Sequence, residues 1–137
     1  SLYDLDKINF HEIYSKFWKE IAISFPNKVG YYSRGKSFSD LNSINSIPFA
    51  GFGYDNTIDL TSMFENQKHG FIQGNFNEQL MLSETDIFLN DLKDFIEKMK
   101  SIENLNCWIC GLGHGINKNT PEKNVHLFIE NIRKEFS

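Results

Sequence analysis

Apolar residues recur along this chain with two different spacings, which alternate. A helical spacing predicts amphipathic helices over residues 6–24, 83–102 and 120–136, and two shorter helices fit 37–44 and 57–65. Short continuous apolar runs predict strands over 28–33, 48–53 and 106–111, and around Phe71 and Ile72. Strands that alternate with helices in this order indicate an α/β fold with a parallel sheet.

Local signals mark the start of the two most regular helices. Ser83 and Asp86 have the spacing of a capping box, and Thr120 precedes Pro121, a residue that favours the first helical position. An apolar stripe follows each signal. We therefore expect Ser83 and Thr120 to cap the first backbone N–H groups of these helices.

Two architectures fit this order of elements. The sheet is either a small open one with helices on both faces, or half of a (β/α)8 barrel, whose complete form takes about 250 residues. No linker, low-complexity segment or internal repeat divides residues 1–137, so we treat them as one unit. In both architectures, ligands bind at the carboxyl ends of the parallel strands. The residues that directly follow the strands are therefore candidates for a binding site.

These candidates combine cations, a carboxylate, amides and an imidazole, a mixture that suits a polar, anionic small ligand. They are Arg34-Gly35-Lys36, Tyr54-Asp55-Asn56, Gln73-Gly74-Asn75 and Gly113-His114-Gly115. Most of them also have a purely structural interpretation: Gly35 and Gly74 fit tight turns, and Asp55 fits a cap for the next helix. His114 is the strongest candidate because glycines flank it and no apolar stripe includes it. The other three histidines are expected to be surface or packing residues: His11, His69 and His126.

Composition narrows the classes of function. The formal net charge is −4 and the basic residues are dispersed, which argues against nucleic acid as a partner. No apolar run reaches the roughly 18 residues that a membrane span needs. Cys107 and Cys110 lie three residues apart in a predicted strand, so their side chains should point to opposite faces, as buried residues and not as zinc ligands. Two such thiols fit a reducing compartment, so we expect a cytoplasmic location, or an organelle stroma if a targeting segment precedes this sequence.

Three motifs in order resemble the C-terminal part of the uroporphyrinogen decarboxylase family. Residues 73–77 read QGNFN, where that family has Q-G-N-L-D-P, and residues 111–125 read GLGHGINKNTPEKNV, where it has N-L-G-H-G-I-x-x-x-T-P-x-E-N-V. Upstream, residues 53–60 read GYDNTIDL and are similar to the family's G-L-D-W-T-V-D-L, with Asn56 in place of the usual tryptophan. Arg34 falls where the family has a basic residue after a strand. The resemblance covers nearly the whole chain.

The resemblance implies a fold, an activity and a partner. The fold is the C-terminal half of a (β/α)8 barrel, and the activity is decarboxylation of the four acetate side chains of uroporphyrinogen III to give coproporphyrinogen III, with neither metal nor organic cofactor. His114 would bind a substrate carboxylate, Ser1 would take the place of a serine or threonine that follows the preceding strand, and Arg34 would add positive potential. The N-terminal half of the barrel, with its arginine-rich segment, aspartate and tyrosine, would be the missing partner. We favour a half that belongs to the same longer chain; the alternatives are a separately encoded half and a second copy of this chain. The complete protein is expected to be a homodimer. The isolated chain is expected to be inactive.

Two alternatives belong to other classes. The cobamide-dependent methyltransferases share this barrel and bind zinc, but they resemble the chain less, because a cysteine stands in place of His114 and an H-x-C pair follows the strand that ends here at Ser33. The other alternative is a half-barrel that acts as a non-catalytic interaction module. The intact Gly113-His114-Gly115 sequence argues against it.

Overall fold

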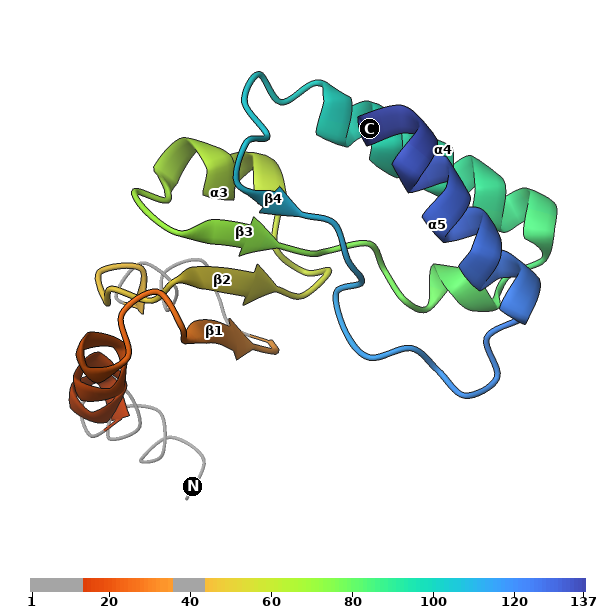
Figure 1. Ribbon diagram of the computed structural model, residues 1–137. Helices are drawn as coiled ribbons and strands as arrows, with labels where there is room; N and C mark the ends of the chain where they lie inside the picture. Colours follow the sequence, from red (N-terminus) through yellow and green to blue (C-terminus); the bar gives the residue numbers. More distant parts are fainter. Residues whose placement is uncertain (1–13, 36–43) are drawn as a thin grey trace, which may run out of the picture.

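A parallel sheet is the centre of the molecule. The computed structural model describes residues 14–35 and 44–137 (Figure 1). Within these ranges the strands are β1 (Gly30–Ser33), β2 (Gly51–Tyr54), β3 (Phe71–Gln73) and β4 (Trp108–Ile109). They lie in the sheet in the order β1-β2-β3-β4, and every pair of neighbours is parallel. A doubly wound open sheet reverses its strand order at a switch point. The uninterrupted order here confirms an α/β fold with the arrangement of half a (β/α)8 barrel.

Helices lie between β2 and β3 and between β3 and β4 along the chain. The described helices are one over residues 14–24, α3 (Leu60–Asn66), a 3-10 turn η1 (Leu80–Leu82), α4 (Thr85–Lys100) and α5 (Glu122–Phe136). The prediction of a helix over 57–65 began three residues too early, because a turn separates β2 from α3. The start of the helix predicted over 6–24 and nearly all of the one predicted over 37–44 lie outside the described residues.

Neither predicted cap has the expected role. The N-cap of α4 is Glu84, not Ser83, and that of α5 is Pro121, not Thr120; neither makes a side-chain cap hydrogen bond. A tertiary contact holds the starts of the two helices together. The Asn124 side chain donates hydrogen bonds to the Met81 and Ser83 carbonyl oxygens, both at 3.0 Å, and so fixes the first turn of α5 against the entry to α4. Asn124 is the donor in both bonds, so they tie the two helix starts together without capping the backbone N–H groups.

The core lies between the sheet and its helices. One residue from β1 and alternate residues of the other strands point toward the helices and pack with their apolar side chains: Tyr31, Phe52, Tyr54, Ile72 and Trp108. A second cluster around Phe76 joins α4 to α5. These two helices run parallel, because Thr85 hydrogen-bonds Asn124 near their starts and Lys100 pairs with Glu135 near their ends. Parallel neighbouring helices are what repeated βα units produce.

The opposite face of the sheet is lined by glycines and by a few larger side chains. Gly51 has to be glycine, since a Cβ there would lie 2.2 Å from the ring of Phe71. Tyr32 and Ile109 on this face remain 47% and 46% exposed, so none of the described helices covers them. In a closed barrel this face is the interior, which side chains fill.

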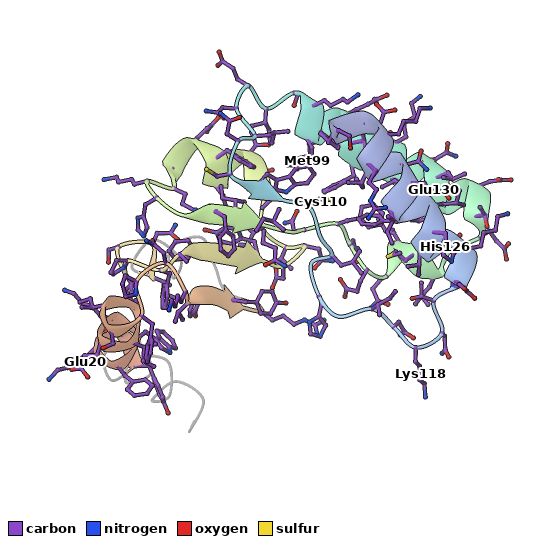
Figure 2. The ribbon with its side chains drawn as sticks, viewed as in Figure 1. Glu20, Met99, Cys110, Lys118, His126 and Glu130 are labelled. Atoms are coloured by element: carbon purple, nitrogen blue, oxygen red, sulfur yellow. The ribbon has the colours of Figure 1, made fainter. Side chains whose placement is uncertain are left out.

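The two cysteines differ from the prediction. Strand β4 is only two residues long, so Cys107 and Cys110 flank it, and Figure 2 labels Cys110 just beyond it. Cys107 is exposed, contrary to the expected burial, whereas Cys110 is half-buried and burial raises its pKa to about 12. Within the described ranges no three His, Cys, Asp or Glu side chains gather into a group that could hold a metal ion. No described helix is long and apolar enough to cross a membrane.

Candidate functional site

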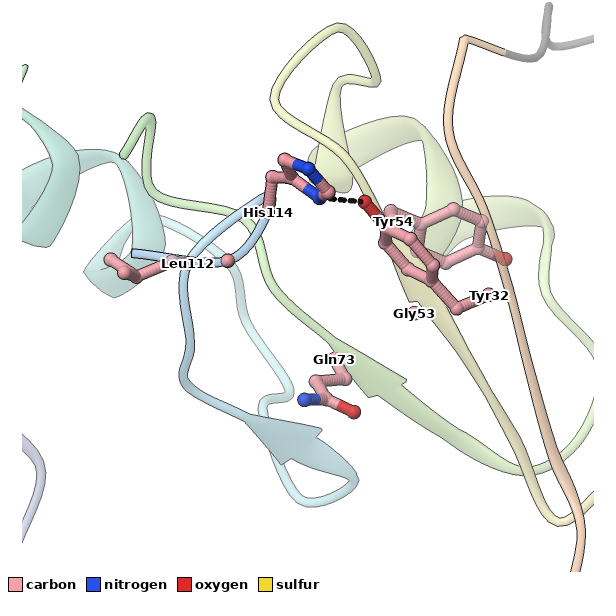
Figure 3. Close-up of a pocket in the computed structure, with 7 residues that line it drawn as sticks. Tyr32, Gly53, Tyr54, Gln73, Leu112 and His114 are labelled. Carbon is pink, nitrogen blue, oxygen red and sulfur yellow. Dashed lines mark hydrogen bonds between the residues drawn. The ribbon is translucent and has the colours of Figure 1, made fainter. Parts of the chain in front are cut away.

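A cavity of about 370 Å³ opens at the carboxyl ends of the strands. It is lined by Tyr32, Gly53, Tyr54, Gln73, Leu112, His114 and Gly115. Figure 3 shows the His114 imidazole facing a tyrosine hydroxyl, with the Gln73 amide also in the lining. The lining therefore comes from β1, β2, β3 and the loop after β4. Three of the four predicted groups contribute to it.

The loop after β4 is held firmly where it presents His114. Leu112 forms a parallel bridge with Phe76, and the Gly113 N–H donates to the Phe76 carbonyl oxygen at 2.7 Å. Gly113 is buried against the loop after β2, where an added Cβ would lie 2.5 Å from the Asn56 nitrogen. His114 itself is exposed. A rigid backbone therefore carries a solvent-accessible imidazole to the rim of the cavity.

Tyr32 is a site residue that the sequence analysis missed. Its hydroxyl donates to the Gly113 carbonyl oxygen at 2.8 Å and lies 3.4 Å from His114 Nδ1. Partial burial and the negative charge of Asp55 raise its pKa above the ordinary value for tyrosine, although Arg34 opposes the shift. The hydroxyl thus stays protonated at neutral pH. The alternation of side chains along β1, which puts Tyr32 on the face opposite Tyr31, was the signal that could have identified it.

Asp55 is buried behind the site and does not line the cavity. Its carboxylate accepts hydrogen bonds from the Gly35 N–H at 2.5 Å, the Thr57 hydroxyl at 2.5 Å and the Thr57 N–H at 2.9 Å. Burial opposes ionisation, but these bonds and Arg34 outweigh it and hold the pKa below its usual range. The structural interpretation of Asp55 was a cap for the next helix; the N-cap of α3 is instead Asp59. Asp55 joins the loop after β1 to the loop after β2.

The other predicted site residues do not line the cavity or lie outside the described residues. Asn75 donates to the Asp55 and Ile58 carbonyl oxygens, at 2.7 and 2.6 Å, and so ties the loop after β3 to the loop after β2. Gly74 has φ +124°, and a Cβ there would lie 2.6 Å from the Tyr54 carbonyl oxygen, which supports its structural interpretation. Arg34 is at the same edge of the sheet but is not among the lining residues. Ser1 and Lys36 lie outside the described residues.

Two of the other histidines are described, and both fit their predicted roles. The Nε2 of His69 is 2.9 Å from the Ile47 carbonyl oxygen, and its ring packs edge-on against Phe52. His126 lies on the exposed side of α5 (Figure 2), where its Nε2 is 3.4 Å from a Glu122 oxygen. Neither is near the cavity lining. His11 lies outside the described residues.

The parallel sheet in chain order, with a histidine-bearing cavity at its carboxyl edge, defines a protein of the (β/α)8-barrel class with a ligand site in the usual place. Comparison with known sequences specifies the family. Residues 4–135 match the profile of the family described as uroporphyrinogen decarboxylase (URO-D), and the chain belongs to that family.

Curated relatives agree with this assignment. The chain is 34% identical over 87 residues to a uroporphyrinogen decarboxylase of Orientia tsutsugamushi (strain Ikeda), a match covering 64% of the chain and 25% of the relative. It is 29% identical over 117 residues to one of Rickettsia africae (strain ESF-5), covering 85% of the chain and 31% of the relative. The matched region thus spans about a quarter to a third of the length of these relatives.

Proposed function

We propose that this chain forms the C-terminal half of the barrel of a uroporphyrinogen decarboxylase, which converts uroporphyrinogen III to coproporphyrinogen III. The observation that carries the proposal is the position of His114 at the mouth of a cavity on the carboxyl edge of the sheet. The family and the names of the relatives support the reaction. No observation favours the zinc methyltransferase or the interaction module as a second candidate.

In this decarboxylation the protein mainly has to bind the carboxylates of the substrate and to deliver protons. Protonation of a pyrrole carbon turns the ring into an electron sink, and the bond to the carboxylate then breaks as carbon dioxide leaves. A second protonation, at the exocyclic carbon, gives the methyl group, and loss of the first proton from the ring carbon restores the pyrrole. His114 is suited to the acetate, because an imidazole can carry a positive charge near neutral pH. The Gln73 amide, also in the lining, can donate a hydrogen bond to the same kind of group.

The uncovered face of the sheet is consistent with a partner that completes the barrel. Tyr32, Gln73 and Ile109 are exposed on it, in positions that a closed barrel would bury. The partner in this proposal is the N-terminal half of the barrel, which brings further groups to the substrate. The complete enzyme would be a homodimer, located in the cytoplasm or an organelle stroma.

The test is a pair of histidine substitutions in the natural, full-length protein. His114→Ala should lower kcat/KM for uroporphyrinogen III by about 10- to 100-fold, the value of a hydrogen bond to a charged group. His126→Ala, on the exposed side of α5, is the matched control and should retain full activity. Coproporphyrinogen formation measures both, and equal thermal stability shows that both variants fold. Unchanged kcat/KM in His114→Ala contradicts the proposal.

A further inference from the structure

Tyr32 and His114 form a pair that neither the family nor the proposed reaction accounts for. They are 82 positions apart, on β1 and on the loop after β4, and they meet across the mouth of the cavity (Figure 3). The Tyr32 hydroxyl contacts two groups at once: the Gly113 carbonyl oxygen at 2.8 Å and His114 Nδ1 at 3.4 Å. It touches both the backbone that carries the histidine and the ring itself.

The directions of these two contacts follow from the atoms involved. A carbonyl oxygen can only accept, so the single hydroxyl hydrogen of Tyr32 is directed to Gly113. The hydroxyl oxygen is then left with lone pairs, and it can contact Nδ1 favourably only if Nδ1 carries a hydrogen. Within the described residues His114 forms no other hydrogen bond, so Nε2 is the ring nitrogen left for a ligand.

We infer that Tyr32 is a positioning residue that keeps a proton on His114 Nδ1 and thereby reserves Nε2 to pair with the substrate and to exchange a proton. The inference rests on the proposed function, since it names what orients the substrate-binding histidine. When the ring is protonated, Nδ1–H bonds to Tyr32 and Nε2–H points its charge-assisted bond at a carboxylate. When the ring is neutral, the lone pair is on Nε2.

The surroundings of Tyr32 favour this arrangement. The hydroxyl has to stay protonated, because a phenolate would lose the bond to Gly113. Partial burial disfavours the phenolate, and the negative charges of Asp55 and Glu78 disfavour it further, against the opposing charge of Arg34. Asp55 also holds the loop that follows β1 through the Gly35 N–H, which limits movement next to Tyr32.

Tyr32→Phe removes the hydroxyl while keeping the ring, and Tyr31→Phe is the matched control. Tyr31 is the next residue on β1, and its ring packs on the other face against Trp18 and Phe49. In the natural full-length protein labelled with 15N-histidine, His114 should give a single tautomer protonated at Nδ1 in wild type and in Tyr31→Phe. Tyr32→Phe should give a mixture. His114→Ala assigns the resonances.

Enzyme kinetics provide a second test of the role of Tyr32. Tyr32→Phe should lower kcat/KM by about two- to tenfold, the value of one neutral hydrogen bond, and should cause no further loss in a His114→Ala background. The inference is overturned if Tyr32→Phe keeps the wild-type tautomer, or if it still lowers kcat/KM when His114 is absent. Full activity in His114→Ala would instead overturn the proposed function, and the tautomer measurement would then still test the positioning of the ring.

Discussion

Replacement of Gly113 by alanine tests whether the rigid loop beneath His114 is what makes the site work. The added Cβ would lie 2.5 Å from the Asn56 nitrogen and 3.1 Å from the Asn56 Cβ, whereas ordinary contacts begin at 3.4 Å. The two loops must therefore separate by about 0.9 Å, the difference between 3.4 and 2.5 Å. The loop that contains Gly113 cannot yield easily, because Gly113 is bonded through its N–H to Phe76 and through its carbonyl oxygen to Tyr32.

Both stability and activity should suffer. Forcing extra volume into a packed contact costs about 1–3 kcal/mol of unfolding free energy. A displacement of about 1 Å at a catalytic group costs up to about 100-fold in rate, so we expect kcat/KM in Gly113→Ala to fall by about that factor. The measurements are urea unfolding and coproporphyrinogen formation in the natural protein.

Gly111→Ala is the matched control from the same loop. The atom nearest to its added Cβ is the Gln73 Nε2 at 3.8 Å, an ordinary contact, so stability and activity should stay close to wild type. The reasoning is refuted if both alanine variants behave alike, or if Gly113→Ala keeps its activity while the structure is unchanged.

Two further predictions concern groups behind the site. Asp55→Asn should lower the free energy of unfolding by about 2 kcal/mol near pH 7. Because folding lowers the pKa of Asp55, this stabilisation is present above about pH 4, the ordinary aspartate pKa, and is lost as the pH falls through the folded value. Urea unfolding should show a smaller difference in unfolding free energy between wild type and Asp55→Asn near pH 3 than near pH 7, with Asp94→Asn, at an exposed position, as the control. A difference that does not change with pH refutes this prediction. Iodoacetamide near pH 8 should modify exposed Cys107 before Cys110, whose pKa is about 12, and mass spectrometry showing the reverse order would contradict this.

The fold was predictable because hydrophobic periodicity reports which faces are buried. The apolar runs located all four strands to within a few residues, and the stripes of α4 and α5 were correct because both helices pack on one face. The shortest elements were the least accurate. Strand β4 is two residues long because only Trp108 and Ile109 pair with β3, so the expected burial of Cys107 failed with the predicted strand.

The sequence could not reveal which polar residues serve the fold and which serve the site. Asp55, Asn75 and His114 all follow strands, yet the first two bond to neighbouring loops and only His114 reaches the cavity. Their partners lie up to 20 positions away, and in the case of Tyr32 and His114 82 positions away. Local pattern carries no information about such pairings, just as it could not show that Asn124 would bond to the carbonyl oxygens of Met81 and Ser83.

On the face of the sheet opposite the helices, glycines and large side chains together leave one part filled and another part open. At the amino ends, Phe71 fills the space above Gly51, where no Cβ fits. At the carboxyl ends, Gly53 contributes no side chain beside Tyr32 and Gln73, and the cavity opens there. The same strand β2 thus uses one glycine to admit an aromatic ring and another to leave room for a ligand. Because only Gly53 lines the cavity, a larger residue there would obstruct the site directly, whereas one at Gly51 would act through the packing of Phe71.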